Sequence, residues 1–188
     1  MPALAPADST VPDGLAGTLT TIARLLEQAG LPYVMIGGHA VNVWLEPRFT
    51  ADVDVTVQAG SGDAERLKTV LGLAGYSVVR EHGTDLPSGP DFVRFRSRDE
   101  TVTLEVQTAK TEFQREAIRR AIAVADAPRV ATAEDLIVFK LIASRPKDRI
   151  DLEGLVRLPG LDWPYVERWA AEWDVLGMLR QLRADVHS

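Results

Sequence analysis

Two aspartates occupy alternate positions in the segment DVDVTV at residues 52–57. Alternation of polar and apolar residues is the period of a half-buried β-strand, so Asp52, Asp54 and Thr56 should face one side while the valines face a core. Side chains two residues apart on a strand lie roughly 7 Å from each other along it. Two carboxylates at this spacing repel unless solvent or a cation screens them, and Mg²⁺ prefers oxygen ligands of this kind. The segment is therefore either a solvent-facing strand or part of a magnesium site.

A second alternating segment, TVTLEVQ at residues 101–107, carries one more carboxylate. Thr103, Glu105 and Gln107 share one face of this expected strand, and its apolar residues share the other. If the two strands are neighbours in a sheet, Glu105 joins the two aspartates on one surface. Three carboxylates that converge from two strands form a metal site or an acid cluster with perturbed pKa values. Taken alone, Glu105 is an ordinary surface acid.

A pair of glycines precedes the aspartates. The apolar segment YVMI at residues 33–36 is an expected strand, and it runs into Gly37 and Gly38 before a short helix at residues 39–45. Paired glycines let backbone N–H groups approach a phosphate closely, and a helix N-terminus favours negative charge. The alternative interpretation is a tight turn without a ligand.

Lys140 lies within an unusually apolar expected helix at residues 133–144. A buried charge without a partner is costly, so this lysine needs a reason. Either its side chain extends along the protein to reach solvent, or it enters a cleft and holds a phosphate as a point charge. Asp148 or Asp151, one helix later, would be its partner. Stabilisation of the N-terminus of their own helix explains these two acids equally well.

Two polar residues lie in the segment just before the Asp-x-Asp strand. Arg48 would contact a triphosphate, tether its own loop, or lie exposed. Thr50 lies two residues before Asp52, and a phosphate on its hydroxyl would add nearly two negative charges beside the carboxylates. Modification of Thr50 is therefore one hypothesis for an off-switch.

The composition excludes several function classes. The chain has no cysteine, which excludes disulfides and thiol catalysis, and its three histidines lie far apart, so no histidine metal site is expected. The formal net charge of −6 is opposite to that of a nonspecific DNA binder, so a nucleic-acid partner must meet a local patch. Arg115, Arg119 and Arg120 form one basic helix face, which is either solvated surface or such a patch.

No apolar run approaches the roughly 20 residues that a membrane span requires. The first 14 residues contain no Lys or Arg and no apolar stretch, so we expect no secretory signal. Cytoplasmic residence is the default expectation.

The remaining pattern predicts an α/β half followed by a helical half. Residues 15–110 form the expected α/β core, residues 111–188 the helical region, and residues 1–14 a disordered lead-in. The predicted class is α+β: a mixed β-sheet with flanking helices, followed by a C-terminal helical bundle. Beyond the elements already named, we expect strands at 76–80 and 91–97 and a turn-rich loop at 82–90. Further helices are expected at 15–29, 62–74, 111–125, 146–157, 163–173 and 175–185. Thr111 with Gln114 should cap the helix at 111–125, Thr132 should cap the helix at 133–144, and Pro146 should lie in the first turn of its helix.

The stretch IGGHAVNVWLEPRFTADVDV resembles the signature of the nucleotidyltransferase fold: an apolar strand, Gly-Gly or Gly-Ser, a short helix, then Asp-x-Asp on the next strand. RFTADVD is similar to the R-x-T-x-D-x-D stretch of the AbiEii/AbiGii-type branch, which includes MenT-like toxins of toxin–antitoxin pairs. Residues 135–155 resemble the helical motif of that branch, and residues 104–121 its linking region. The resemblance covers about residues 30–157. The third carboxylate is usually Asp in this family, whereas this chain has Glu105.

The resemblance implies a site and an activity. Asp52, Asp54 and Glu105 would bind one or two Mg²⁺ ions, with Glu105 as an alternative acceptor of the proton from the attacking hydroxyl. The residues implied to bind the nucleotide and its phosphates are Gly37, Gly38, Arg48, Thr50, Lys140, Asp148 and Asp151. Lys140 also counts among the implied catalytic residues.

The implied reaction is transfer of a nucleotide from a nucleoside triphosphate to an acceptor. The branch makes tRNA the expected acceptor, with growth inhibition as the consequence and an antitoxin protein as partner. Two alternatives stay open. One is a small acceptor, as in the aminoglycoside-modifying members of the superfamily, and the other is a nucleotide-binding regulatory or antitoxin module without catalysis.

Overall fold

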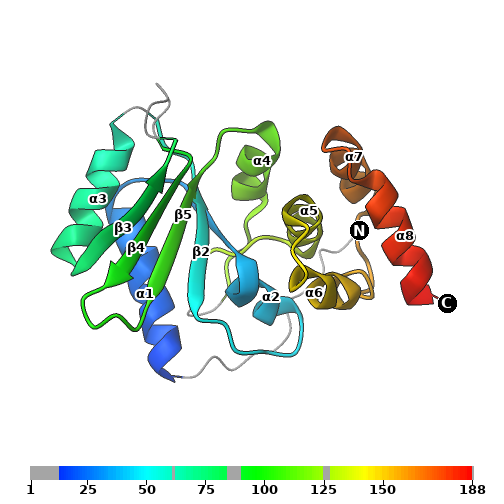
Figure 1. Ribbon diagram of the computed structural model, residues 1–188, viewed down its shortest axis with the longest axis horizontal. Helices are drawn as coiled ribbons and strands as arrows, with labels where there is room; N and C mark the ends of the chain where they lie inside the picture. The colour runs from blue at the N-terminus through cyan, green and yellow to red at the C-terminus, as the bar shows by residue number, and fades with distance from the viewer. Residues whose placement is uncertain (1–12, 61, 84–89, 125–127, 188) are drawn as a thin grey trace.

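The computed structural model describes residues 13–60, 62–83, 90–124 and 128–187. In Figure 1 a five-stranded mixed sheet lies beside the C-terminal helices, so the predicted α+β class is confirmed. The strands are β1 (Tyr33–Ile36), β2 (Asp52–Val57), β3 (Tyr76–His82), β4 (Phe92–Ser97) and β5 (Thr103–Thr108), and the helices are α1 (Asp13–Gln28), α2 (Gly37–Trp44), α3 (Asp63–Leu73), α4 (Glu112–Arg120), α5 (Ala133–Ala143), α6 (Asp148–Leu155), α7 (Trp163–Glu172) and α8 (Leu176–His187).

The sheet has the strand order β1-β2-β5-β4-β3, and β2 and β5 are its one parallel pair among the described strands. The alternation of both strands buries Val53 and Val55 on β2 and Leu104 and Val106 on β5, as predicted. Their polar residues face the opposite side together, because residues paired in register on neighbouring strands point the same way. The fold therefore brings two strands far apart in sequence into one acidic surface.

Helices pack on the sheet and on one another. α3 packs against β3 and α1, while α2 packs against β2, and α4 contacts β1 and β2. α5 contacts α2, α6 and α7, so it joins the sheet to the C-terminal helices (Figure 1). Buried apolar side chains from both halves form one cluster, which extends from Leu26 and Phe95 to Leu136 and Trp169. In the described ranges no helix is long and apolar enough to cross a membrane.

Both predicted helix caps are confirmed. The Oγ1 of Thr111 accepts a hydrogen bond from the N–H of Gln114 at 3.2 Å, and Oε1 of Gln114 accepts from the N–H of Thr111 at 3.0 Å. The Oγ1 of Thr132 likewise accepts from the N–H of Asp135 at 3.2 Å. These bonds satisfy N–H groups that have no partner inside the helix.

The end of α4 differs from the prediction of a helix to about residue 125. The helix ends at Arg120, because Ala121 adopts an extended conformation with ψ of 128°. Ile122 then exchanges two backbone hydrogen bonds of 2.9 Å with Val130. Val130 also pairs with Met35 of β1, so this arrangement depends on the assembled sheet and local helix propensity does not reveal it.

Other boundaries move less. α6 begins at Asp148, so Pro146 lies in the turn before the helix rather than in its first turn, and the N–H of Asp148 donates to the carbonyl of Arg145 at 2.9 Å. β3 continues to His82, two residues past the predicted end at 80. α1 begins at Asp13, inside the predicted lead-in, while the rest of that lead-in and most of the predicted loop at 82–90 lie outside the described residues.

Candidate active site

The register of the parallel pair aligns Asp54 directly with Glu105. Asp52 lies two residues earlier on the same face of β2, so the three acids predicted to converge share one surface. Neither Asp52 nor Asp54 makes a hydrogen bond or an ion pair with any residue that the structure describes. Both line the same cavity. Two neighbouring carboxylates that form no ion pair with the described residues repel each other, and this repulsion favours binding of a cation.

The surroundings of Asp54 raise its pKa. Burial raises the pKa of Asp54 to about 7, and the negative charges of Glu105 and Asp52 add to the rise. The positive charges of Arg145 and Lys147 lower it only in part. A carboxyl group with this pKa is half protonated at neutral pH, so a cation that binds there competes with a proton.

Glu105 differs from the two aspartates because it has a cation beside it. Arg94 is its cross-strand partner on β4, and the guanidinium forms an ion pair with Oε1 of Glu105. The guanidinium carbon of Arg94 also lies 5.7 Å from the centre of the Phe92 ring. The sequence analysis missed Arg94. The signal was present, since Val93 and Phe95 alternate with it as buried residues and place Arg94 on the polar face.

The two glycines lie where the first turn of α2 meets the acidic strand. Gly37 has a φ of +69°, and a Cβ on it would lie 2.0 Å from Oδ2 of Asp54. A Cβ on Gly38 would lie 2.6 Å from Oγ1 of Thr50. The helix begins at Gly37, two residues before the predicted start, so both glycines contribute first-turn N–H groups without an intrahelical acceptor. Only glycine permits this close approach.

Lys140 is buried, with 4% of its surface exposed, so it does not extend to solvent. Its Nζ donates to Oδ1 of Asp148 at 3.0 Å and to Oδ2 of Asp151 at 2.6 Å. Arg48 donates to both oxygens of Asp151, from Nε at 2.9 Å and from a terminal nitrogen at 2.6 Å. Arg145 donates to Asp148 from Nε at 2.7 Å. Lys140, Arg48 and Arg145 thus share two buried carboxylates, so this network has a net charge of one positive.

The two aspartates of this network stay ionised. Burial would raise the pKa of Asp148, but hydrogen bonds from Arg145 and Lys140 outweigh it and lower the pKa. For Asp151, burial is likewise outweighed by hydrogen bonds from Arg48 and Lys140. The carboxylates therefore hold the cations in place, and we interpret them as anchors of the cationic side chains rather than as direct ligands of a phosphate.

Arg48 is also fixed through its backbone. Asn42 of α2 donates from Nδ2 to the carbonyl of Arg48 at 2.7 Å, and the N–H of Arg48 donates back to Oδ1 of Asn42 at 3.1 Å. Together with Asp151, these bonds tether the segment that carries Thr50 to α2 and α6. The tethering role considered for Arg48 is thus present in the structure.

Two cavities meet at the carboxylates. The first, which we call the polar cavity, has a volume of about 180 Å³ and is lined by Gly38, Arg48, Thr50, Asp52, Asp54, Arg94, Glu105, Lys140, Arg145, Lys147 and Asp148. The second, which we call the apolar-walled cavity, has a volume of about 380 Å³ and is lined by Ile36, Gly37, Asp54, Val55, Asp91, Phe92, Glu105, Gln107, Leu136, Phe139, Lys140, Ile142, Ala143 and Arg145. Of the predicted site residues, Asp151 alone lines neither, since it lies behind Lys140 and Arg48.

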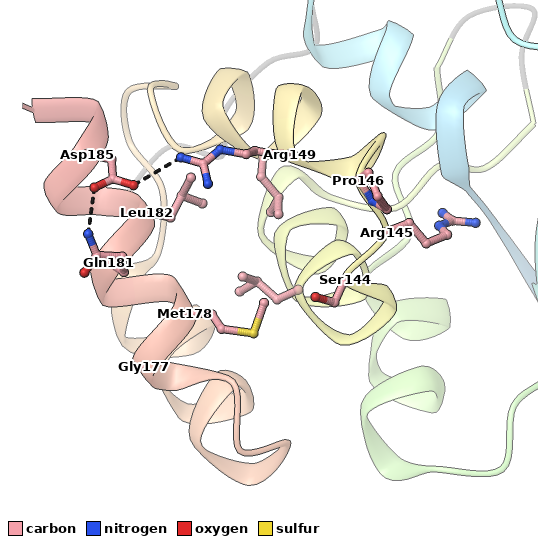
Figure 2. A pocket seen from close by; sticks show the side chains of 11 residues that line it. Ser144, Arg145, Pro146, Arg149, Gly177, Met178, Gln181, Leu182 and Asp185 are labelled. Carbon is pink, nitrogen blue, oxygen red and sulfur yellow. Dashed lines mark hydrogen bonds and ion pairs between the residues drawn. The ribbon is translucent and has the colours of Figure 1, made fainter.

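A larger cavity of about 510 Å³ lies between α8 and the turn that joins α5 to α6. Figure 2 shows Met178 and Leu182 of α8 facing Ser144 and Arg149, with Asp185 bound to Arg149 and Gln181 at one end. Arg145 points away from α8 in this view. None of the three carboxylates lines this cavity, so it is separate from the acidic surface.

The donor set fits a metal ion that binds together with a phosphate ligand. Among the described residues, no group of three or more His, Asp or Glu side chains is arranged to hold a metal. Mg²⁺ is usually held by one or two carboxylates together with substrate phosphates and water, rather than by a closed cage of side chains. Asp52 and Asp54, which have no cation partner, meet that requirement, whereas Glu105 is already engaged by Arg94.

The arginines of α4 do not form a free basic patch. Arg119 pairs with Glu112 at 2.8 Å and also with Glu116, and Arg115 donates to the carbonyl of Lys110 at 3.1 Å. The guanidinium carbon of Arg120 lies 3.9 Å from the centre of the Tyr165 ring and beside two further acids. The basic face expected from the sequence is therefore largely offset by acidic side chains.

Comparison with known families identifies the class. Residues 15–185 match the family described as nucleotidyltransferase of unknown function (DUF6036), and the chain belongs to this family. The site and the family thus agree with the resemblance to the nucleotidyltransferase fold. No curated protein shows significant similarity to the sequence.

Solved structures support the same fold. An antigenic nucleotidyltransferase-like protein from Paracoccidioides brasiliensis is 18% identical with a TM-score of 0.56, over 97% of this chain and 95% of that one. The lincosamide antibiotic adenylyltransferase LnuA, bound to lincomycin, is 15% identical with a TM-score of 0.56, over 79% and 99%. The antibiotic-resistance factor ANT(2″)-Ia is 18% identical with a TM-score of 0.52, over 94% and 97%. At these identities the likeness defines the fold and leaves the substrate open.

Proposed function

We propose that the protein transfers a nucleoside monophosphate from a nucleoside triphosphate to a hydroxyl group, with Mg²⁺ held by Asp52 and Asp54. The observation that supports this most is the pair of aspartates without any described ion-pair partner, in a cavity whose lining also includes the anchored cation Lys140. The metal ion of a bound triphosphate would contact the two aspartates, and the phosphates would contact the cations. Family membership supports the same reaction class.

The residues that line the polar cavity, together with the neighbouring Gly37, have distinct roles in this proposal. The first-turn N–H groups of Gly37 and Gly38 would bind phosphate oxygens at the start of α2. Lys140 donates two of its three Nζ hydrogens to aspartates, which leaves one for a phosphate. Arg145 and Lys147 add positive charge at the same wall. Bound Mg²⁺ would supply neutralisation of charge on the triphosphate.

Glu105 is positioned to receive the proton of the attacking hydroxyl. Arg94 holds its Oε1, and Oε2 has no hydrogen-bond partner among the described residues. The acceptor oxygen would form a bond to the α-phosphorus while the bond to the pyrophosphate oxygen breaks. The proton would pass to Oε2, and pyrophosphate would leave with the electron pair.

The acceptor defines two versions of this function. The AbiEii/AbiGii-type resemblance supports tRNA, and with it a toxin role and an antitoxin partner. The apolar-walled cavity beside Glu105 supports a small acceptor instead, the class to which lincomycin belongs in the LnuA complex. A module that binds nucleotide without transferring it is the non-enzymatic alternative, and nucleotide binding without product would favour it.

The test is a transfer assay with each α-labelled nucleoside triphosphate and Mg²⁺, with total tRNA in one reaction and a pool of inositols, aminocyclitols and methyl hexosides in another. We expect label to enter an acceptor, and we expect Asp52→Ala to abolish the transfer while circular dichroism and melting temperature show an intact fold. Glu172→Ala is the matched control, since this exposed acid on α7 lies outside both cavities. Equal activity of Asp52→Ala and the wild type would refute the proposal.

A further inference from the structure

We propose that the apolar-walled cavity is the acceptor subsite, and that it takes a small, phosphate-free ring compound rich in hydroxyl or amino groups. This inference rests on the proposed nucleotidyl transfer and names the substrate class of the same site. It is carried by the chemistry of the cavity lining, which differs from that of the polar cavity although the two share Asp54, Glu105, Lys140 and Arg145.

The shared wall sets where two substrates would meet. If a triphosphate lies in the polar cavity, an acceptor in the apolar-walled cavity would meet it beside Asp54 and Glu105, which line both cavities. Glu105 is the proposed proton acceptor, so the group above it should carry the attacking hydroxyl. Arg48, Thr50 and Gly38, which surround the polar cavity, do not line the apolar-walled one. The second cavity is therefore on the acceptor side of the carboxylates.

The walls fit a ring with an apolar face. Phe92 comes from β4, while Phe139 and Ile142 come from α5. Phe139 is held by Phe113, with ring centres 4.7 Å apart. Rigid aromatic and aliphatic walls of this kind bind the flat or alicyclic body of a small ligand. A volume of about 380 Å³ lies within the usual range for small-molecule sites, roughly 300–1,000 Å³.

The polar groups in the cavity favour hydrogen-bond donors. Its acids are Glu105, which has one oxygen without a described partner, Asp91, which pairs with Lys110, and Asp54, which the proposed function assigns to Mg²⁺. Lys140 and Arg145 both donate to Asp148, outside this cavity. Carboxylates accept hydrogen bonds from hydroxyl and ammonium groups, but they repel the phosphodiester oxygens that accompany every internal nucleotide of an RNA.

The basic helix face expected from the sequence gives RNA little additional attraction. RNA binding requires unpaired Lys and Arg side chains that release counterions from the phosphates. The α4 arginines, the basic face expected from the sequence, are paired with acids or stacked on Tyr165. The overall charge of −6 points the same way. A small acceptor needs no such patch.

The experiment compares two acceptor pools with a variant that fills the cavity. Ala143→Phe, at the end of α5, places an aromatic ring in the lining, and Ile142→Trp is a second filling variant in case the first one misfolds. Ile150→Phe is the control, because Ile150 is 74% exposed and lines neither cavity. One pool holds inositols, aminocyclitols and methyl hexosides, and the other holds total tRNA. Transfer from each α-labelled nucleoside triphosphate is measured with Mg²⁺, and binding of the α,β-methylene analogue of the triphosphate that is used is measured by calorimetry.

We expect label in the small-molecule pool, a loss of about tenfold or more in the filled variants, and unchanged binding of the nucleotide analogue. Label in tRNA that persists in Ala143→Phe overturns the acceptor assignment and leaves nucleotidyl transfer intact. Weaker analogue binding in the folded filling variants also overturns it, since the cavity would then hold the nucleoside. No label in either pool contradicts the transfer itself, and the acceptor assignment falls with it.

Discussion

Asp54 and Glu105 are direct neighbours on two parallel strands, although 50 residues separate them in the chain. Only one of the two forms an ion pair, since Arg94 pairs with Glu105 and no described cation pairs with Asp54. This asymmetry separates two roles on one surface. We propose that Asp54, with Asp52, holds the metal ion, whereas Arg94 holds Glu105 in a fixed orientation beside them.

Asp54 should destabilise the metal-free protein at alkaline pH. Its pKa in the folded state is about 7, above the ordinary value of 3.8, so the folded state favours the protonated form. Stability is therefore lost as pH rises from the ordinary value of 3.8 to about 7, and the loss is complete above 7. We expect Asp54→Asn to be more stable than the wild type by about 2 kcal/mol at pH 8.5 in EDTA, with a smaller difference at pH 5.5. Urea unfolding at both pH values measures this, and a gain independent of pH would contradict it.

Lys140 should contribute strongly to stability because it neutralises two buried carboxylates. Lys140→Met leaves Asp148 and Asp151 with one cation each, and we expect a loss of about 3 kcal/mol in the free energy of unfolding at pH 7. Arg149→Met removes an exposed ion pair with Glu153 and should cost less than about 1 kcal/mol. Chemical denaturation of both variants provides the comparison. Similar losses would show that the Lys140 network is not tightly coupled.

The contribution of Asp151 should disappear in acid. Its pKa is lowered below the ordinary value of 3.8 in the folded state, so its contribution is fully present above that value and is lost as pH falls through the lowered pKa. The stability difference between wild type and Asp151→Asn should stay constant between pH 5 and 8 and shrink below about pH 4. Urea titrations across this range measure it. A difference that grows toward acid pH would have the wrong sign.

Gly37 should tolerate no side chain. A methyl group there would overlap Oδ2 of Asp54 and would force a residue with a φ of +69° to carry a Cβ. We expect Gly37→Ala to reduce transfer by about a hundredfold or more, because Asp54 must move from its position. Gly17→Ala in α1 is the control, since its Cβ would meet nothing within 4 Å. That variant should keep full activity and gain up to about 1 kcal/mol in stability.

Arg94 should oppose metal binding while it supports catalysis. Arg94→Met removes a positive charge beside Glu105, so the carboxylate cluster becomes more negative and should bind Mn²⁺ or Mg²⁺ more tightly. The rate of transfer should nevertheless fall, by about tenfold, since Glu105 loses its fixed orientation. Calorimetric metal titration and single-turnover kinetics give the two readouts. Weaker metal binding in Arg94→Met would contradict the assigned position of its charge.

Local pattern was sufficient to place the individual acids on one face of their strands. The alternation in DVDVTV and TVTLEVQ fixes which side chains are buried, and the structure agrees. Periodicity does not reveal which strands are neighbours, however, so the sequence predicted that Glu105 joins the aspartates only if the two strands are adjacent in the sheet. Arg94 was overlooked for the same reason, since its contact with Glu105 depends on pairing between β4 and β5.

Backbone pairing with Val130, which also pairs with Met35 of β1, explains the element that was predicted least well. The sequence favours a helix through residue 125, but the bridge between Ile122 and Val130 ends it at Arg120. The network around Lys140 was foreseen as one ion pair, whereas it contains two aspartates and two further cations. Side chains from three separate segments meet there, and only the assembled fold determines how they share their hydrogen bonds.

Metal-dependent nucleotide binding by Asp52 and Asp54 can be measured without knowledge of the acceptor. Calorimetric titration of α,β-methylene-ATP into the wild type and into Asp52→Asn and Asp54→Asn, each with Mg²⁺ and with EDTA, isolates the metal-dependent part. Binding should strengthen with Mg²⁺ by about tenfold or more in the wild type and gain nothing from Mg²⁺ in either variant. An equal gain from Mg²⁺ in wild type and variants would contradict a metal ion held by these two carboxylates.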